Sequence, residues 1–447
     1  MFRHILTIIW NNRRHNGWLI AGLFVMSTCM WYAVDYVYTV TVNQTRPLGF
    51  DWHNVYALNI GVLTPESHKF LSDKLHTKNA TGDFYTFMDR LEHHPAVESV
   101  CYTRMHKHYV WTNQGASLIY DTITCNSWMR TVSSGYFRVF RVKGADGSSP
   151  EQLAGRANLT DIIITDNLAC QLFPGRSAVG EWVKNTLNGD SVRIAAVCEN
   201  QKYNEFTSHQ RATYIPLHFT QKRPFYYLEA PYLGVYIRVH PDSDGDDFIR
   251  RFRKDMREQL MIGNFYLEDM RPMTDFRNEQ LKEPRNDLYT YLSVAVFFLL
   301  NAFLAVLGTF WFRTQQRRSE LGLRVALGGS RVSLCRLLWG EGVVLLTLAF
   351  IPAIVVAANL GLAEIVSDYP VEFTLFRFVA GIFITYLLLV FTVFLAVWIP
   401  ARQAMKIQNR QKHCVKSKKI KLYICVAFKI IAYICVHIVK QRSYVTL

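Results

Sequence analysis

Four long apolar runs constrain this chain more strongly than any other feature of its sequence. A helix needs about 20 apolar residues to cross the hydrocarbon core of a bilayer. The first run has no charge from residue 17 to residue 34, and it continues to residue 40 if Asp35 lies at the interface. We predict four membrane-spanning helices, at residues 17–40, 287–312, 337–363 and 378–399. A cleaved secretory signal is the alternative for the first, but its apolar run is too long and no small-residue cleavage site follows it.

The basic residues are concentrated in three segments. The formal net charge is +15, and Arg and Lys crowd into residues 3–14, 313–336 and 402–447, whereas the 364–377 loop carries three acidic residues and one Arg. The positive-inside rule places both termini and the 313–336 segment in the cytoplasm. Residues 41–286 and the 364–377 loop then lie outside. Because membrane orientation accounts for the charge, we expect the lipid bilayer as a partner and no nucleic acid.

The N-terminal segment, residues 1–16, is predicted to be an amphipathic cytoplasmic helix. Ile5, Ile8, Ile9 and Trp10 fall near one helical face, and basic residues lie elsewhere. Such a helix can lie in the plane of the membrane interface. The simpler interpretation is a helix that only leads into the first span.

The large segment between the first two spans shows the pattern strand, helix, strand twice. Strands are predicted at 55–63 and 96–104 with a helix at 83–93 between them, and the same order recurs from residue 233 to residue 270. Two such units in one sheet indicate a ferredoxin-like lobe. Short β-like runs at about 105–205 indicate an inserted, β-rich lobe. The predicted fold class is therefore a membrane protein with four transmembrane α-helices and a large α+β extracytoplasmic domain (a split βαβ lobe plus a β-rich inserted lobe) between helices 1 and 2.

The sequence contains no catalytic or cofactor motif that we recognise. It has no G-x-x-x-x-G-K-[ST], G-x-S-x-G or H-E-x-x-H pattern, so we expect no enzyme activity, no cofactor and no metal. His106 and His108 alternate on a predicted strand, but no carboxylate or cysteine with ligand spacing accompanies them. None of the nine cysteines shows C-x-x-C spacing. Four of them lie in the outward domain, where they could form disulfides in any of three pairings or remain free: Cys101, Cys125, Cys170 and Cys198.

Glu341 is the one carboxylate inside the third apolar run. Ionisable residues within spans are functional candidates. Glu341 is predicted about one turn inside the cytoplasmic end, however, where it can reach water or pair with Arg336. We therefore favour a carboxylate at the membrane interface, as an anchor or in a structural ion pair, over a transport role.

The stretch "RTQQRRSELGLRVALGGSRVSLCRLLWGEGVVLL" resembles the segment after the second span of FtsX-like permeases of the MacB type. That segment reads roughly R-x-R-E-[IL]-G-[IL]-R-x-A-[LI]-G-A, followed by a span with an early glutamate. Gly329 replaces the usual final alanine. The matching positions are Arg318, Glu320, Leu321, Gly322, Leu323, Arg324, Ala326, Leu327, Gly328 and Glu341.

Four further stretches extend this resemblance over about residues 1–407. They are "VSSGYFRVFRVKGADG", "IIITDNLACQLFPGRSAVGEWV", "VRIAAVCENQKYNEF" and "PARQAMKI". After Ile407 the family usually continues with a [DN]-P-x-x-A-L-R pattern that this chain lacks. The cytoplasmic tail, 400–447, is therefore atypical after 407, and its apolar run at 422–439 is a non-native or frameshifted tail or, less favoured, a fifth span.

The resemblance implies a permease of the bacterial inner membrane, with four spans and a large periplasmic domain between the first two. It also implies a homo- or heterodimer of permeases and a cytoplasmic ABC ATP-binding subunit in which ATP hydrolysis takes place. ATP-driven motion would then be transmitted across the membrane for export or efflux of an antibiotic, peptide or lipoprotein. The alternative is an FtsX-like transmembrane regulator of a cell-wall hydrolase without transport. A periplasmic adaptor or hydrolase is a possible partner in these two cases. A third interpretation is an ATP-independent membrane anchor or sensor.

The segment between the second and third spans is our candidate for coupling to the ATPase. If residues 317–327 are helical, Arg317 and Arg324 lie on one face, and Gly328 and Gly329 end the helix, so that Ser330 can cap the next one. A solvated basic loop that only fixes orientation is the alternative. The proposed coupling residues are Arg317, Arg318, Glu320, Gly322, Arg324, Gly328 and Gly329.

Overall fold

We describe the fold from a computed structural model of the chain. The structure describes residues 7, 9–10, 13–71, 80–104, 106–109, 114–157, 160–186, 189–220, 222–317, 331–363 and 373–406. The chain divides into two compact units, which are treated separately below. One comprises Met1–Ser27, Leu299–Ala353 and Tyr386–Leu447, and the other comprises Thr28–Phe298 and Ile354–Thr385. The predicted amphipathic helix lies largely outside the described residues, and the tail after 407 lies entirely outside them.

Four long helices carry the apolar runs. They are α2 (Arg13–Thr45), α10 (Lys282–Gln316), α12 (Arg331–Leu362) and α13 (Leu375–Lys406). Each contains a stretch long and apolar enough to cross a membrane. The helices extend beyond the predicted spans because the polar residues that flank the apolar runs continue the same main-chain hydrogen bonding.

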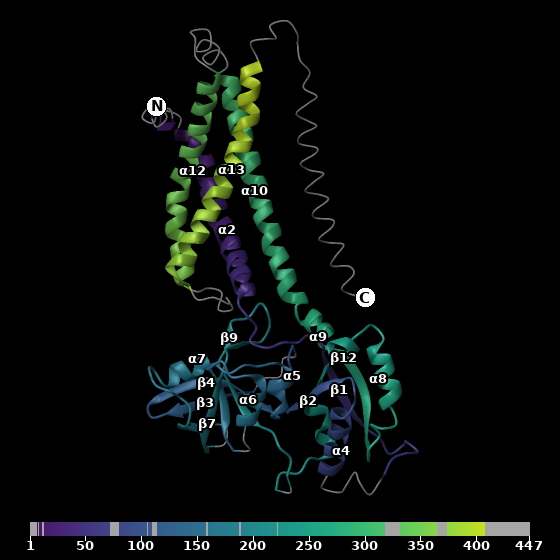
Figure 1. The fold of residues 1–447 in the computed structure, drawn as a ribbon. Helices are drawn as coiled ribbons and strands as arrows, with labels where there is room; N and C mark the ends of the chain where they lie inside the picture. Colours follow the sequence, from purple (N-terminus) through teal and green to yellow (C-terminus); the bar gives the residue numbers. More distant parts are fainter. Residues whose placement is uncertain are drawn as a thin grey trace. The chain divides into compact units, whose positions relative to one another are not determined.

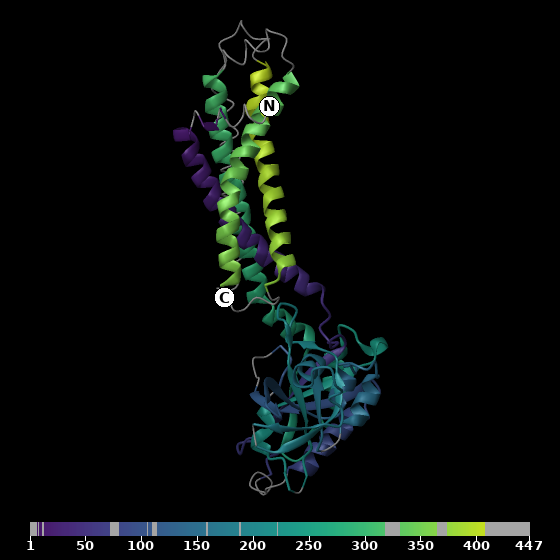
Figure 2. The same cartoon turned by 90° about the vertical axis from the view of Figure 1, so that its left-hand side faces the viewer.

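Within the first unit, α12 and α13 are in contact at several levels, and both views show the two helices side by side (Figures 1 and 2). The rings of Trp339 and Phe394 lie 4.4 Å apart, and the hydroxyls of Thr347 and Tyr386 lie 2.9 Å apart. Gly342 permits this approach, because a Cβ atom there would lie 2.8 Å from the Val393 side chain.

The large domain of the second unit contains the split βαβ lobe. Its strands are β1 (Val55–Val62), β2 (Val97–Arg104), β11 (Leu233–Val239) and β12 (Phe265–Pro272), in the order β2-β11-β1-β12. Because β11 is antiparallel to both β1 and β2, and β1 is antiparallel to β12, each βαβ pair is parallel with one strand between its members. The predicted fold class is confirmed.

Two amphipathic helices cover one face of this lobe. These are α4 (Thr81–Glu92) and α8 (Phe248–Met256), which bury their apolar stripes against the sheet (Figure 1). Apolar residues alternate along β11, and Leu233, Val235 and Ile237 on one face lie in this core. The opposite face of β11 is buried as well, so the strand is central to the domain.

The inserted lobe is a closed barrel. Its strands are β3 (Gln114–Tyr120), β4 (Ile123–Val132), β5 (Ile162–Thr165), β6 (Trp182–Asn185), β7 (Ser191–Cys198) and β10 (Ala212–Pro216). Pairing runs β4-β3-β6-β7-β5-β10 and returns to β4 through a parallel β10–β4 pair. Closure removes the exposed edges of the sheet. Leu118, Ile164 and Ile194 fill its core, and α7 (Asp166–Leu172) packs against it. The lobe thus continues past residue 205.

The structure decides two questions left open by the sequence. Cys101, Cys125, Cys170 and Cys198 are all free thiols, and all except Cys170 are buried. The prediction of a strand at His106 and His108 is wrong: the 106–109 segment is a buried turn with the two rings 5.0 Å apart. The aromatic surroundings explain this, since His108 packs on Phe50 and bonds the Tyr136 hydroxyl at 2.7 Å. Among the described residues, no group of His, Cys, Asp and Glu could hold a metal.

Candidate functional site

A buried polar cluster joins three helices in the first unit. Arg313, on α10, donates from Nη1 to Glu341 Oε1 of α12 at 2.7 Å and from Nη2 to Asn16 Oδ1 of α2. Asn16 is itself buried and donates to the carbonyl of Ile9 at 2.8 Å. Glu341 Oε2 lies 3.7 Å from Arg317 Nη1. Glu341 is thus a buried anion shared by two arginines.

The observed environment of Glu341 differs from the expected one. Its ion-pair partners are Arg313 and Arg317, whereas we expected water or Arg336, which is exposed. The physical reason is that α12 already begins at Arg331, so Glu341 lies ten residues inside the helix and faces α10. A carboxylate at that depth needs a cation from a neighbouring helix.

Of the proposed coupling residues, the structure places only Arg317. It follows directly on α10, and its main-chain N–H donates to the carbonyl of Arg313 at 2.9 Å. Its side chain turns back toward Glu341. The others lie outside the described residues: Arg318, Glu320, Gly322, Arg324, Gly328 and Gly329.

A second buried ion pair, in the other unit, was missed by the sequence analysis. Arg377 of α13 donates from Nε to Asp35 Oδ1 of α2 at 3.0 Å and from Nη2 to Asp35 Oδ2. The neighbouring rings of Trp31 and Phe378 meet edge to face. The sequence predicts Asp35 at the membrane interface and Arg377 in the 364–377 loop. A lone acid in one apolar run and a lone base at the border of another are the signal that could have found the pair, because buried charges have to be neutralised.

A short hairpin lies at the C-terminal end of α2. It consists of β8 (Gln201–Lys202) and β9 (His209–Gln210), which pair antiparallel. Lys202 is fully buried, and Nζ donates to the main-chain carbonyls of Asn43 and Arg46. Burial lowers the pKa of Lys202 to about 8, with a further contribution from Arg46. The hairpin therefore holds the last turn of the helix.

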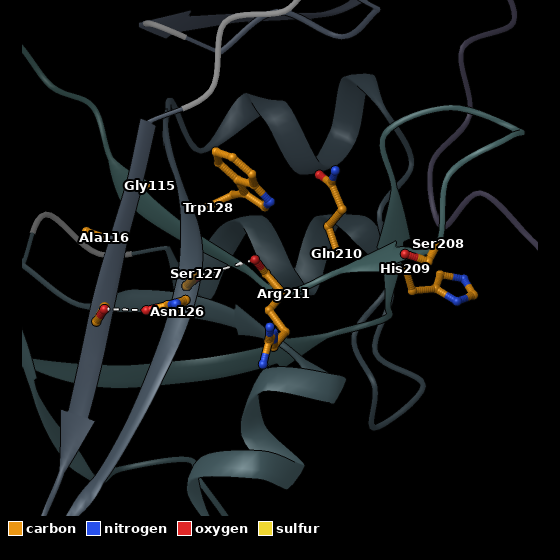
Figure 3. Close-up of a pocket in the computed structure, with 10 residues that line it drawn as sticks. Gly115, Ala116, Asn126, Ser127, Trp128, Ser208, His209, Gln210 and Arg211 are labelled. Carbon is orange, nitrogen blue, oxygen red and sulfur yellow. Dashed lines mark hydrogen bonds between the residues drawn. The ribbon is translucent and has the colours of Figure 1, made fainter. Parts of the chain in front are cut away.

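The same hairpin forms one wall of a groove on the inserted barrel, with a volume of about 620 Å³ (Figure 3). The opposite wall is the β3–β4 hairpin, where Trp128 lies across from Gly115 and Asn126 accepts from Ser117 at 2.7 Å. Trp128 and Gln210 point toward the same side of the groove in Figure 3. The complete lining is Gly115, Ala116, Ser117, Asn126, Ser127, Trp128, Ser208, His209, Gln210 and Arg211. The volume is within the range of ligand pockets.

Comparison with protein families identifies both halves of this arrangement. A model of the MacB-like periplasmic core domain matches residues 42–255, and a model of the FtsX-like permease C-terminal region matches residues 292–408. The chain belongs to the MacB/FtsX-like permease family. Membership implies an ABC transporter permease component that associates with an ABC ATPase subunit.

Solved structures similar to this MacB/FtsX-like chain include three isolated domains. The periplasmic region of MacB from Actinobacillus actinomycetemcomitans has 12% identity and a TM-score of 0.31, and the match covers 52% of this chain and 95% of that one. A domain of a protein described as a permease from Porphyromonas gingivalis has 13% identity and a TM-score of 0.32, with 50% and 92% coverage. The extracellular domain of the ABC-type transporter YknZ from Gram-positive bacteria has 14% identity and a TM-score of 0.28, with 48% and 100% coverage. No curated protein matches the chain.

Proposed function

We propose that this chain is the permease subunit of an ABC exporter in a bacterial inner membrane, with both termini in the cytoplasm. In this proposal a cytoplasmic ATPase moves the 313–336 segment, and the helices pass the motion to the large periplasmic domain. The cargo is of the antibiotic, peptide or lipoprotein class. A dimer of such permeases, homomeric or heteromeric, forms the functional unit.

The observation that carries this proposal is the Arg313–Glu341–Arg317 cluster at the border of the candidate coupling segment. It ties the end of α10 to α12 and, through Asn16, to α2, so a movement of residues 318–330 would act on three helices together. The Gly-containing motif next to this cluster is the part of the sequence that most resembles the family.

The length of the helices also supports transmission of motion. At 1.5 Å per residue, the 35 residues of α10 extend about 52 Å, compared with about 30 Å for the hydrocarbon core. A continuous helix of that length carries displacement from one side of the membrane to the other. No aqueous channel is required for such a mechanism.

The test is coupling in a reconstituted complex. The chain is co-purified with the ABC ATPase that binds it, and ATP turnover is measured in nanodiscs with and without the permease. We expect the permease to change turnover several-fold, and Glu320→Arg or Gly328→Val to abolish that change while membrane insertion stays normal. Gly245→Val, in the open space of a loop of the large domain, is the matched control.

Different outcomes separate the alternatives. If no ABC ATPase binds the chain, the permease proposal is wrong and an ATP-independent anchor is favoured. If turnover is coupled but no cargo moves in proteoliposomes, and a cell-wall hydrolase co-purifies through the large domain, the regulator function replaces export. Normal coupling in Glu320→Arg and Gly328→Val would refute docking by the 317–327 segment.

A further inference from the structure

The β8–β9 hairpin holds the C-terminal end of α2 by three sets of bonds. The Lys202 ammonium donates to the carbonyl of Asn43 in the last turn of α2, where the helix dipole favours a cation, and to that of Arg46 just after the helix. Asn43, on α2, donates in return to the carbonyls of Glu205 and Thr207 at 3.0 and 2.9 Å. The main-chain N–H of Lys202 donates to the carbonyl of Leu48 at 2.9 Å. The hairpin and the end of α2 therefore satisfy each other's buried hydrogen-bonding groups.

The segment that leaves α2 is also pressed against the hairpin. Gly49 has a φ of +79°, and a Cβ atom there would lie 2.2 Å from the carbonyl oxygen of Asn200. His209, on β9, bonds the carbonyl of Pro47 at 3.1 Å. Residues 47–49 consequently have little freedom to move without the hairpin.

The hairpin has a second contact, with the segment that leads into α10. Glu205, at its tip, pairs with Arg277 of α9 (Met273–Gln280), and both side chains are largely buried. The Arg277 guanidinium also stacks on Trp52, 4.8 Å from the ring centre. Since α10 begins at Lys282, the hairpin contacts both chain segments that connect the large domain to the spans.

Its third contact is with the β4–β10 strand pair, the seam at which the barrel closes. The side-chain oxygens of Gln201 and Gln210 accept from the buried Arg130 at 2.8 and 3.2 Å. Arg130 also donates to the Tyr214 hydroxyl at 2.7 Å. Arg130 lies on β4 and Tyr214 on β10, and the two are direct neighbours in the parallel β4–β10 pair. The hairpin is thus bonded to the two strands whose pairing closes the barrel.

We propose that the β8–β9 hairpin is a coupling link that passes movement of the C-terminal end of α2 to the inserted barrel, with Lys202 as its positioning residue. A buried ammonium cannot leave its carbonyls without a large desolvation cost, so the hairpin follows the helix end. Its other side then displaces Arg130 and the β4–β10 seam. Because Ser208, His209 and Gln210 form a wall of the groove, the same movement changes the width of the groove. This inference rests on the proposed function for its role in the transport cycle.

The first test needs no ATPase and uses the full chain in detergent. Hydrogen exchange is measured for the main-chain amides of β4 and β10 in wild type and in Lys202→Met, which removes the ammonium that donates to the carbonyls of Asn43 and Arg46. We expect exchange in these strands to rise roughly tenfold, because loss of the cap loosens a distant seam through the hairpin. Lys202→Arg should restore slow exchange. Lys184→Met, at an exposed position of β6, is the matched control.

A second variant, on the barrel side of the hairpin, distinguishes the link from misfolding caused by Lys202→Met. Gln210→Ala leaves the α2 cap intact and removes one bond to Arg130, so exchange should now rise at residues 43–49 as well as in β4. The link would be overturned if Lys202→Met left the exchange rates of β4 and β10 as in wild type. It would also be overturned if Gln210→Ala left the exchange rates of residues 43–49 unchanged.

A measurement on the complex separates this inference from the proposed function. In wild type, trapping the ATPase with ATP should change exchange in β4 by several-fold, and Lys202→Met should abolish that change while ATP turnover persists. An unchanged response in Lys202→Met would refute the link alone. A wild-type complex with no nucleotide response in the large domain would refute the proposed function, and the detergent test would still decide the link.

Discussion

The two buried ion-pair sites of the long helices differ in how far solvent reaches them. Asp35 and Arg377 form a pair with two contacts, and their side chains are 3% and 5% exposed. Glu341 is 4% exposed but serves two arginines, of which Arg313 is 12% and Arg317 29% exposed. The Asp35–Arg377 pair is almost closed to solvent, whereas the Glu341 cluster has two arginines for one carboxylate and is partly open to solvent.

This difference indicates different roles. Breaking the buried Asp35–Arg377 pair leaves an uncompensated charge that water cannot readily reach, so the pair acts as a permanent connection between α2 and α13. The Glu341 cluster can exchange one arginine for the other, or for water, at a smaller cost. A cluster of that kind, next to the segment we propose for coupling, suits a part of the molecule that has to rearrange.

The largest effect is expected for Arg377→Met, which leaves Asp35 buried without its cation. We expect the free energy of unfolding in detergent to fall by about 3–5 kcal/mol, as for other broken buried pairs. The measurement is a denaturant titration followed by tryptophan fluorescence. Arg250→Met, which removes one member of an exposed pair with Asp247, is the control and should change stability little.

A double variant checks the cause of this loss. Asp35→Asn combined with Arg377→Met removes both charges and should recover most of the lost stability. If the double variant is as unstable as the single one, packing of the long side chain matters more than charge, and the contrast between the two sites loses its basis.

An intermediate effect is expected for Glu341→Gln. The amide oxygen of the new glutamine can still accept from Arg313 Nη1, and Asn16 Oδ1 still accepts from Arg313 Nη2. We therefore expect the free energy of unfolding to fall by about 1–2 kcal/mol. The same titration measures it. Glu279→Gln is a matched control, since Glu279 lies 2.7 Å from Arg271, the same distance as in the buried pair, but is half exposed. A fall in stability as large as that of Arg377→Met would mean that the Glu341 cluster is as permanent a connection as the Asp35–Arg377 pair.

The spans and the split βαβ lobe were predictable because their signals are local. Apolar runs, the alternation of β11 and the stripe of α8 each occupy a short stretch of sequence. The closed barrel was not predictable, because its closing pair joins Thr213 and Tyr214 to strand neighbours more than 80 residues earlier. Nothing in the sequence of β4 or β10 distinguishes a closed sheet from an open one.

The polar sites divide in the same way. Glu341 was detectable as a carboxylate in an apolar run, but its partner comes from another helix, 28 residues away. Asp35 and Arg377 are 342 residues apart. Lys202 had no signal at all, since a lysine in a polar loop is ordinarily exposed. Its burial depends on the free carbonyls at the end of α2, a feature of the fold and not of the adjacent sequence.

The smallest effect is expected for Arg317→Gln. Arg317 lies 3.7 Å from Glu341 and remains partly solvated. Its contribution to the free energy of unfolding should therefore resemble that of a surface ion pair, about 0.5 kcal/mol or less. The variant should nevertheless reduce the change in ATP turnover that the permease causes, because it removes the alternative partner of Glu341. Arg257→Gln, at an exposed position of the large domain, is the control. A loss of more than 2 kcal/mol would mean that both arginines are needed to hold Glu341, and the cluster would then be as fixed as the Asp35–Arg377 pair.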